Sequence, residues 1–307
     1  MIEPVIDDPV EAGHLASLPP DGITIFTLEG DSVRGALASG TRMLSLMRRA
    51  HGLGVLETLV LGKAYLAAGL LSVTIKGDDR LAVRADGSGQ AQGYAVECTA
   101  AGGVRGRLFS SPFQLDAPPE SLDTSGLVGP GTLSVTRFMA GRTEPFTGSA
   151  AAKTGDLARD LAWYFHASEQ IKTSFTLGVR LDKQGRVIGA GGLYLQALPF
   201  ASDEALERVE RLVYSLPCLG SAFAEGVSRR DLAFRFFTFF DLNLLEERPL
   251  AFSCPCDRER MAGFLRALPK DERDDLAANG PFPVELACHN CGSVYSFTEA
   301  EIKGMLA

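Results

Sequence analysis

The spacing of four cysteines near the carboxyl end constrains this chain more than any other feature of its sequence. Cys254 and Cys256 form a Cys-x-Cys pair, Cys288 and Cys291 form a Cys-x-x-Cys pair, and residues 257–287 lie between them. Cys-x-x-Cys is a common spacing in zinc knuckles, and four thiolates make a closed tetrahedral set without a position for a reacting water. The sequence therefore predicts one structural zinc site made of these four sulfurs.

A small carboxy-terminal zinc-binding domain, residues 249–307, is expected to fold around this site. A segment of that size has a marginal hydrophobic core, and at about 0.05–0.15 kcal/mol per residue it holds about 3–9 kcal/mol. Structural zinc contributes roughly 10–16 kcal/mol in small peptide sites. The metal is therefore expected to decide whether this domain is folded.

The same four thiolates are targets for oxidants, because coordination to a metal keeps the sulfurs deprotonated. Spacing alone leaves two readings open: a zinc site that never changes, and a site that oxidation dismantles. A framework of structural disulfides is disfavoured, because the first residues, 1–13, are acidic and carry no signal-peptide pattern.

Composition places the chain among soluble globular proteins. Its 307 residues are 46% hydrophobic and 22% charged, with a net charge of −8. An acidic balance disfavours nucleic acid as a partner, because phosphate binding depends on clustered Lys and Arg. The most apolar stretch, residues 64–75, is shorter than the roughly 20 residues that span a bilayer. We therefore expect a cytoplasmic protein that binds neither nucleic acid nor membrane.

After an amino-terminal extension, residues 1–20, the segment 21–200 is predicted to form one α+β domain of mixed sheet and helix. Short alternating runs predict strands, apolar periodicity predicts helices, and a Pro-, Gly- and Ser-rich segment predicts a surface loop. The predicted strands are 23–25, 81–83, 94–98, 177–181 and 187–195, the predicted helices are 56–71 and 156–171, and the predicted loop is 117–131.

Residues 201–248 are predicted to form a helical linker between the two domains. A first helix, residues 205–215, has one apolar stripe and ends before Pro217. A second predicted helix, residues 231–241, carries phenylalanines on more than one face. Either neighbouring domains cover both faces, which we favour, or part of this surface is made to be uncovered and to bind another molecule. The phenylalanines concerned are Phe234, Phe236, Phe237, Phe239 and Phe240.

A few other residues resemble functional groups but have simpler explanations. Cys98 lies in a predicted strand and is expected to be a small buried hydrophobe, while Cys218 in the linker is expected to be unreactive. His289 stands beside a complete set of ligands and is expected to be exposed and idle. Asp156 is expected to stabilise a helix start, and Gly189–Gly192 to mark a bulge or close packing rather than a dinucleotide site.

The residues around the cysteines, together with segments of the predicted α+β domain, resemble the heat-shock protein 33 family, also called 33-kilodalton chaperonins. The matching segments are 252–261 and 288–297 around the cysteines, 160–171, 177–179 and 189–199 in the amino-terminal domain, and, more loosely, 61–71. The resemblance thus covers nearly the whole chain from about residue 21.

What the resemblance implies is a chaperone that needs no ATP and is not an enzyme. It is inactive when reduced and zinc-bound, and cysteine oxidation with release of zinc converts it into a holdase for unfolding client proteins. In this family oxidation pairs neighbouring sulfurs, which here would join Cys254 to Cys256 and Cys288 to Cys291. A homodimer of the oxidised form is a further expectation.

The zinc-binding domain is expected to act as a lid on the linker, so that its unfolding exposes the five phenylalanines as a client-binding surface. Two other functions stay open. A thiol-disulfide oxidoreductase would use Cys288 and Cys291, but it lacks a βαβ context and leaves the other two cysteines without a purpose. A static zinc-ribbon module would bind a fixed partner or nucleic acid, and the acidic charge disfavours the latter.

Overall fold

A five-stranded antiparallel sheet forms one half of the main body in the computed structural model, which describes residues 8–114, 121–199 and 201–306. Its strand order is β10-β1-β2-β9-β8. Neighbours along the chain pair directly, as in β1 with β2, but β10 comes from the far end of the chain to pair with β1. The strands are β1 (Gly22–Leu28), β2 (Val33–Ser39), β8 (Thr173–Leu181), β9 (Val187–Ala197) and β10 (Asn243–Pro249).

A second, six-stranded sheet has the order β11-β5-β4-β3-β6-β7. All its pairs are antiparallel except the last addition, since the short β11 lies parallel to β5. Both sheets thus receive an edge strand from the carboxyl-terminal part of the chain. The strands are β3 (Arg80–Gly87), β4 (Gly93–Thr99), β5 (Gly103–Leu108), β6 (Gly131–Phe138), β7 (Phe146–Ala152) and β11 (Ala251–Phe252).

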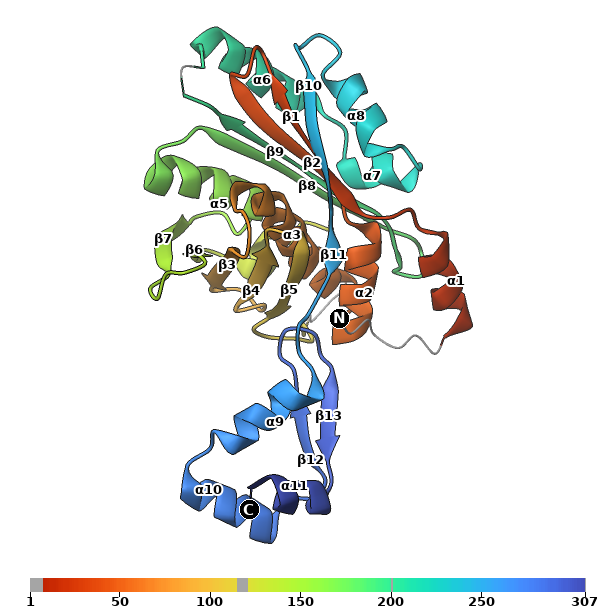
Figure 1. Ribbon diagram of the computed structural model, residues 1–307. Helices are drawn as coiled ribbons and strands as arrows, with labels where there is room; N and C mark the ends of the chain where they lie inside the picture. Colours follow the sequence, from red (N-terminus) through yellow and green to blue (C-terminus); the bar gives the residue numbers. More distant parts are fainter. Residues whose placement is uncertain (1–7, 115–120, 200, 307) are drawn as a thin grey trace.

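Helix α3 (Val55–Leu71) lies between the two sheets (Figure 1). It is apolar on nearly every face because both sheets pack against it, and residues such as Leu61, Tyr65 and Leu66 are fully buried. Together with the 3₁₀ turn η1 (Ser72–Thr74), this helix is long and apolar enough to cross a membrane, yet 83% of its most apolar window is buried inside the protein. It is the central core helix of the fold.

The predicted strands and helices of the α+β domain are confirmed, with small changes at their ends. The expected hairpin is β8 and β9, and Asp156 caps helix α5 (Leu157–Tyr164) by accepting from the Arg159 N–H at 3.0 Å. A π-helical turn, η2 (Phe165–Glu169), completes the predicted helix. The predicted loop is wrong at its end, because α4 (Ser125–Val128) and the start of β6 fall inside it, and residues 117–120 lie outside the described ranges.

Three helices of the linker cover the face of the first sheet that is turned away from α3 (Figure 1). Their apolar side chains share a separate core with that sheet, in which Phe237 packs on Phe26 with ring centroids 4.9 Å apart. Gly189 and Gly191 of β9 allow close approach, because an added Cβ would lie 2.1 Å from Gly220 O or from the Phe223 ring. The helices are α6 (Asp203–Ser215), α7 (Leu219–Ala224) and α8 (Arg229–Phe236).

The linker is not helical to its end, which corrects the prediction for residues 201–248. Helix α8 stops at Phe236, before the end of the predicted helix 231–241, and residues 243–249 form the edge strand β10. Arg229, the first residue of α8, donates to Ser39 Oγ at 2.8 Å and pairs with Glu247 of β10 at 3.1 Å. Helix α8 and β10 are therefore tied to each other and to the sheet.

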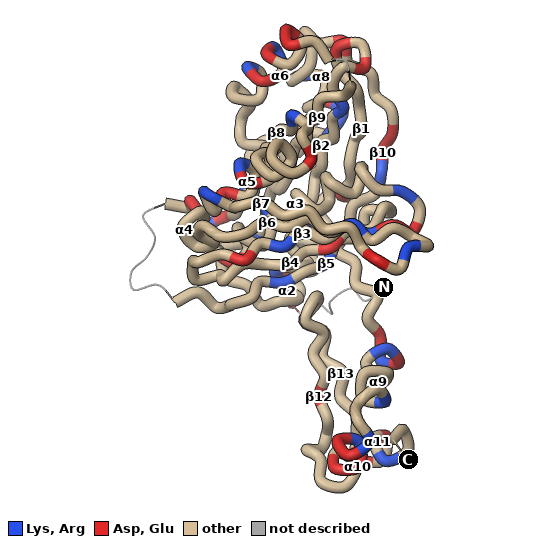
Figure 2. The backbone as a smooth tube through the Cα atoms, turned by 90° about the vertical axis from the view of Figure 1, so that its left-hand side faces the viewer, with Lys and Arg blue, Asp and Glu red and all other residues tan. Residues whose placement is uncertain are grey.

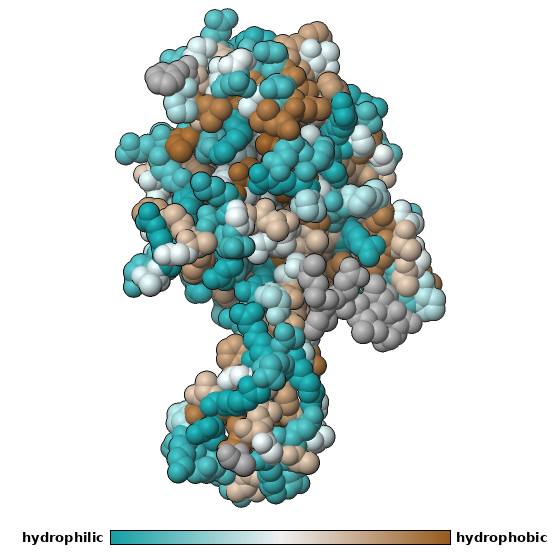
Figure 3. Space-filling model, in the orientation of Figure 1, coloured by the Kyte–Doolittle hydropathy of each residue, from teal (hydrophilic) through white to brown (hydrophobic). Residues whose placement is uncertain are grey.

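A small carboxy-terminal lobe hangs from the main body by a narrow neck (Figures 1 and 3). It contains the hairpin β12 (Val284–Ala287) and β13 (Val294–Phe297) with three helices, α9 (Arg258–Arg266), α10 (Lys270–Asn279) and α11 (Glu299–Leu306). Charged residues are frequent on these helices and on α6 at the opposite end of the molecule (Figure 2). The lobe and the linker helices thus lie at opposite ends, so the expectation that the zinc-binding domain covers the linker is wrong.

The amino-terminal extension contains one helix, α1 (Pro9–Ser17), which docks on helix α2 (Thr41–His51) and on the start of β9. Leu15 is buried in the main core, and its carbonyl accepts from Arg42 at 3.1 Å. His14 bonds the carbonyl of Val187 at 3.0 Å, and Glu11 pairs with Arg49 at 3.3 Å. The described part of the extension is therefore an integral piece of the domain.

Candidate metal centre

An irregular connection and a tight turn bring the four cysteines to the neck of the molecule. Cys254 and Cys256 follow β11 and precede α9, whose first turn is capped by Asp257 accepting from the Arg260 N–H at 2.7 Å. Cys288 and Cys291 lie in the turn between β12 and β13, where the Cys288 carbonyl accepts from the N–H groups of the two residues that close the turn. The cluster therefore joins two segments that are far apart in sequence.

The four sulfurs lie at distances from one another that suit a tetrahedrally coordinated metal ion. All four cysteines are buried, and their Sγ atoms lie within 4.8 Å of one another. The Sγ atoms of Cys254 and Cys288 are 3.8 Å apart and those of Cys256 and Cys291 are 3.2 Å apart. Zinc–sulfur bonds of about 2.3 Å place sulfurs about 3.8 Å apart in a regular tetrahedron. The arrangement fits a four-thiolate metal site, and all four cysteines are free of disulfides.

Hydrogen bonds within the cluster distribute its charge unevenly. A bond from the Cys291 thiol, together with bonds from the Cys256 backbone and Arg105, lowers the pKa of Cys254 to about 4. Burial raises the pKa of Cys256, and donation to Cys254 raises that of Cys291 well above its usual range. Tyr295 from β13 adds a hydroxyl that donates to Cys256 Sγ at 3.2 Å.

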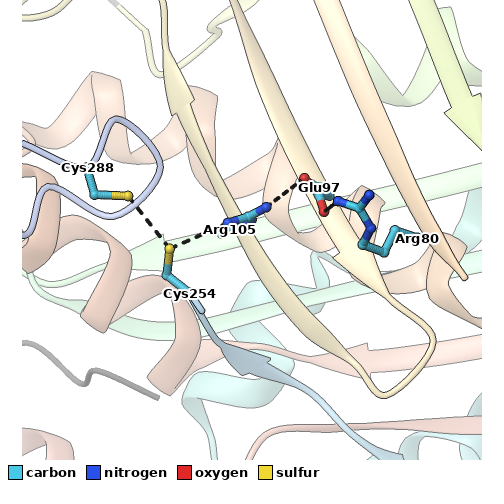
Figure 4. Close-up of polar contacts among 5 residues, drawn as sticks. All are labelled: Arg80, Glu97, Arg105, Cys254 and Cys288. Carbon is cyan, nitrogen blue, oxygen red and sulfur yellow. Dashed lines mark hydrogen bonds and ion pairs between the residues drawn. The ribbon is translucent and has the colours of Figure 1, made fainter. Parts of the chain in front are cut away.

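An arginine of the main body also contacts the cluster (Figure 4). Arg105 of β5 donates through Nη1 to Cys254 Sγ at 3.7 Å and through Nη2 to Glu97 of β4 at 3.1 Å. Glu97 accepts in turn from Arg80 of β3 at 2.7 Å. A row of alternating charges thus leads from the sulfurs across three strands of the second sheet.

Backbone contacts hold the neck against β5 and α2. The Ala251 N–H donates to Gly102 O at 3.0 Å and the Ser253 N–H donates to Val104 O at 2.9 Å, while the Gly106 N–H donates to Asn290 O at 3.3 Å. Both cysteine segments are therefore tied to the core domain through peptide groups, and the first is also tied through Arg105.

Gly292 sets the close approach of the second cysteine turn to α2. Its φ is +71°, and an added Cβ would lie 2.1 Å from the carbonyl oxygen of Ala50 at the end of α2. A Gly292→Ala substitution should therefore loosen the docked neck by at least about 1–2 kcal/mol, because the left-handed conformation alone costs that much for a residue with a Cβ. Faster hydrogen exchange at the Gly106 N–H, with metal content unchanged, is the expected result.

A matched control for this substitution is Gly263→Ala in α9, where an added Cβ meets no atom within 4 Å. That variant should exchange as the wild type does, since alanine is favoured in a helix. Equal exchange at Gly106 in both variants would show that the second cysteine turn does not depend on this contact.

The phenylalanines that the sequence singles out do not meet the cysteines, and they are not all covered. Phe237 is 1% exposed, whereas Phe234 is 47% and Phe239 is 87% exposed, so the prediction that both faces are covered is wrong for these two. Apolar surface gathers at the upper end of the molecule in Figure 3. Phe236 and Phe240 are partly buried against the same sheet core as Phe237.

The other singled-out residues lie where simpler explanations place them. Cys98 is fully buried in β4 and burial raises the pKa of its thiol far above the usual range, while Cys218 is exposed. His289 is exposed and lines an open pocket of about 550 Å³ with His51 and Arg107, outside the four-sulfur set. Among the described residues, the candidate ligands that lie together are the four cysteines.

Sequence reasoning missed Arg105, Tyr295 and the strand β11. Arg105 and Tyr295 stand in strands with no local pattern that marks a contact with sulfur. The sequence offered only an indirect signal for Arg105. Arg105 and Arg107 are two positions apart in an alternating run, so both side chains belong on one face of a strand.

Comparison with known proteins gives a consistent result. The family model described as Hsp33 protein matches residues 21–298. A 33 kDa chaperonin of Desulforamulus reducens is 34% identical over 270 residues, which cover 88% of this chain and 91% of that protein. One from Geobacter sulfurreducens is 32% identical over 282 residues, covering 92% and 93% respectively.

A solved structure is similar over the same extent. The crystal structure of a 33 kDa chaperonin, heat shock protein 33 homolog, from Thermotoga maritima superposes with a TM-score of 0.84 at 28% identity. The match covers 94% of this chain and 98% of that one, so it includes the main body, the linker and the cysteine lobe.

Proposed function

The chain belongs to the Hsp33 family, a family of chaperones, and from this premise we propose that it is a redox-regulated holdase that works without ATP. It is inactive while its four sulfurs are reduced and zinc-bound, and oxidation of the sulfurs makes it bind unfolding client proteins. The relatives are named chaperonins, which supports a binding protein rather than an enzyme. The proposal places it in the cytoplasm, with a homodimer as a state of the oxidised form and with neither nucleic acid nor membrane as a partner.

The observation that carries the proposal is the position of the sulfur cluster at the neck. Cys254, Cys256, Cys288 and Cys291 lie together where β11 leads into the lobe and where the turn between β12 and β13 meets the body, at the narrow neck of Figure 1. Zinc, when bound there, holds the four sulfurs as thiolates in one closed set. Oxidation to disulfides removes the thiolates that hold such an ion, and each short loop so closed removes little entropy from the unfolded lobe.

The route from the cluster to the client surface runs along the chain. Residues 243–252 form β10 and β11 in succession, with buried Leu250 between them, so the segment that ends at Cys254 also completes the edge of the first sheet. When the neck is released, β11 loses its anchor, and β10 stays bound through its pairing with β1 and the Arg229–Glu247 ion pair. Arg229 connects that strand to α8, and the loosening therefore reaches the linker helices.

The surface hidden by the linker helices suits clients that share only exposed apolar area. On the sheet it consists of apolar side chains that point away from α3, and on the helices of the residues that cover them. Among these residues are Phe26, Leu28, Leu37, Leu193 and Leu195 on the sheet, Val209, Leu219 and Leu232 on the helices, and Phe237 just after α8. We propose that their separation forms the client site, with Phe234, Phe236, Phe239 and Phe240 at its border.

Aggregation of an unfolding test protein, measured by light scattering without ATP, tests this function. The reduced, zinc-bound protein should leave aggregation unchanged, whereas the same protein after peroxide treatment at unfolding temperature should suppress it. Reduction of insulin disulfides by both forms should be equally poor, which separates the proposal from a thiol-disulfide oxidoreductase. Equal suppression by reduced and oxidised protein would falsify the redox switch and favour a static zinc module.

A further inference from the structure

Arg105 is a core-domain side chain that touches a sulfur of the cysteine cluster (Figure 4). Its guanidinium lies between Cys254 Sγ at 3.7 Å and the Glu97 carboxylate at 3.1 Å. The Arg105 side chain is 17% exposed, so solvent screens this contact less than it screens an ion pair on the surface. The guanidinium therefore experiences the charge of the cluster directly.

Oxidation changes that charge. Four thiolates outweigh one divalent ion, so the reduced, metal-bound cluster is anionic. When hydrogen peroxide oxidises a pair of thiolates, the two sulfurs give up two electrons and form one S–S bond. The O–O bond of the peroxide accepts the electrons and breaks, and its two oxygens take up two protons and leave as two waters. The disulfides are neutral and cannot retain the ion. Arg105 is then left with Glu97, a carboxylate that it shares with Arg80.

We propose that Arg105 is the positioning residue that makes docking of the neck depend on the oxidation state of the sulfurs. In the reduced protein it attracts the anionic cluster and holds the Cys254 end of β11 against β5. In the oxidised protein the same contact contributes nothing to docking, because its anionic partner is gone. The inference rests on the proposed function, since it assigns a residue to the release of the neck.

Two neighbouring arginines, Arg107 and Arg80, differ from Arg105 in that they do not contact Cys254. Arg107 lies two residues further along β5, on the same face, and lines the open pocket beside His289 instead of contacting a sulfur. Arg80 lies on the other side of Glu97, away from the cluster. Removing either charge changes the local field without breaking a contact with Cys254, and Arg107 is the closer match.

Hydrogen exchange in the full, zinc-loaded chain tests the proposal at the peptide groups that join β11 to β5. The N–H groups of Ala251 and Ser253 bond to Gly102 O and Val104 O, so their exchange reports undocking. Arg105→Gln should speed their exchange about 10-fold in the reduced protein, the effect expected for loss of a charged hydrogen bond. Arg105→Lys, which keeps the charge, should have a smaller effect, and zinc content should stay at the wild-type level in both.

The redox dependence of the effect distinguishes charge sensing from ordinary packing. After oxidation, wild type and Arg105→Gln should exchange at the same rate, and Arg107→Gln should match wild type in both states. An Arg105→Gln effect that is absent in the reduced protein, or equally large in both states, would overturn the inference. If oxidised wild type suppresses no aggregation while exchange still depends on Arg105 only in the reduced state, the proposed function fails and the docking role stands.

Discussion

Purified under reducing conditions, a Cys256→Ser, Cys288→Ser variant should contain little zinc and should have an unfolded lobe on a folded main body. Two of four buried ligands are lost, and the lobe's own core is small beside the roughly 10–16 kcal/mol that structural zinc supplies. Wild type should carry one zinc per chain. Metal analysis and limited proteolysis measure both effects, with new cleavage expected from residue 253 onwards.

The matched control is Cys218→Ser, which removes an exposed thiol of the linker. That variant should keep its zinc and resist proteolysis as wild type does. Full zinc occupancy in the double variant would mean that the four cysteines are not the metal ligands, and a protease-resistant lobe without zinc would mean that the metal does not decide its folding.

A Phe237→Ala substitution should release the linker helices from the reduced protein. The ring is 1% exposed and packs against Phe26, Phe236 and Phe240, and truncation of such a buried ring costs about 3–5 kcal/mol. The linker helices form a short stack on one sheet face, and the free energy that holds them there is small. We therefore expect proteolysis within residues 201–242 and partial suppression of aggregation without oxidation. Zinc content should be unchanged, because the cysteines lie at the neck and not among the linker helices.

Phe239→Ala is the control, since this ring is 87% exposed and supports no packing in the reduced form. It should leave the reduced protein protease-resistant and inactive. Weaker aggregation suppression after oxidation would identify Phe239 as part of the client surface. If Phe237→Ala is as resistant and as inactive as Phe239→Ala when reduced, the linker helices are not the cover of the client site.

Local sequence patterns predicted the features that depend on neighbours in the chain. The alternation of residues 94–98 and the turn at 182–185 specify strands and a hairpin through contacts within a few residues, and both are present as β4 and the β8–β9 pair. The four cysteines were predicted as one cluster because metal coordination needs only suitable ligands and a linker long enough to close the site.

Features that depend on distant partners were not predictable in the same way. The polar segment 243–249 has no strong strand pattern, and it becomes a strand because β1 presents a free edge at the other end of the sequence. Phe234, Phe237 and Phe239 differ in exposure because α8 stops at Phe236 and the chain then turns. Helical spacing cannot reveal such a stop. The position of the lobe depends on contacts of its cysteine segments with β5 and α2, which are distant in sequence.

The pairing of β1 with β10 also bears on how each molecule is made. Strand β1 leaves the ribosome early, whereas β10 and the cysteine turns follow near the end of synthesis. Such a non-local pairing forms late and slowly, because most of the chain must be present before the two strands meet. Every nascent molecule therefore passes through a conformation with an open β1 edge and an unanchored linker, and the state with both edges paired is the last one to be assembled.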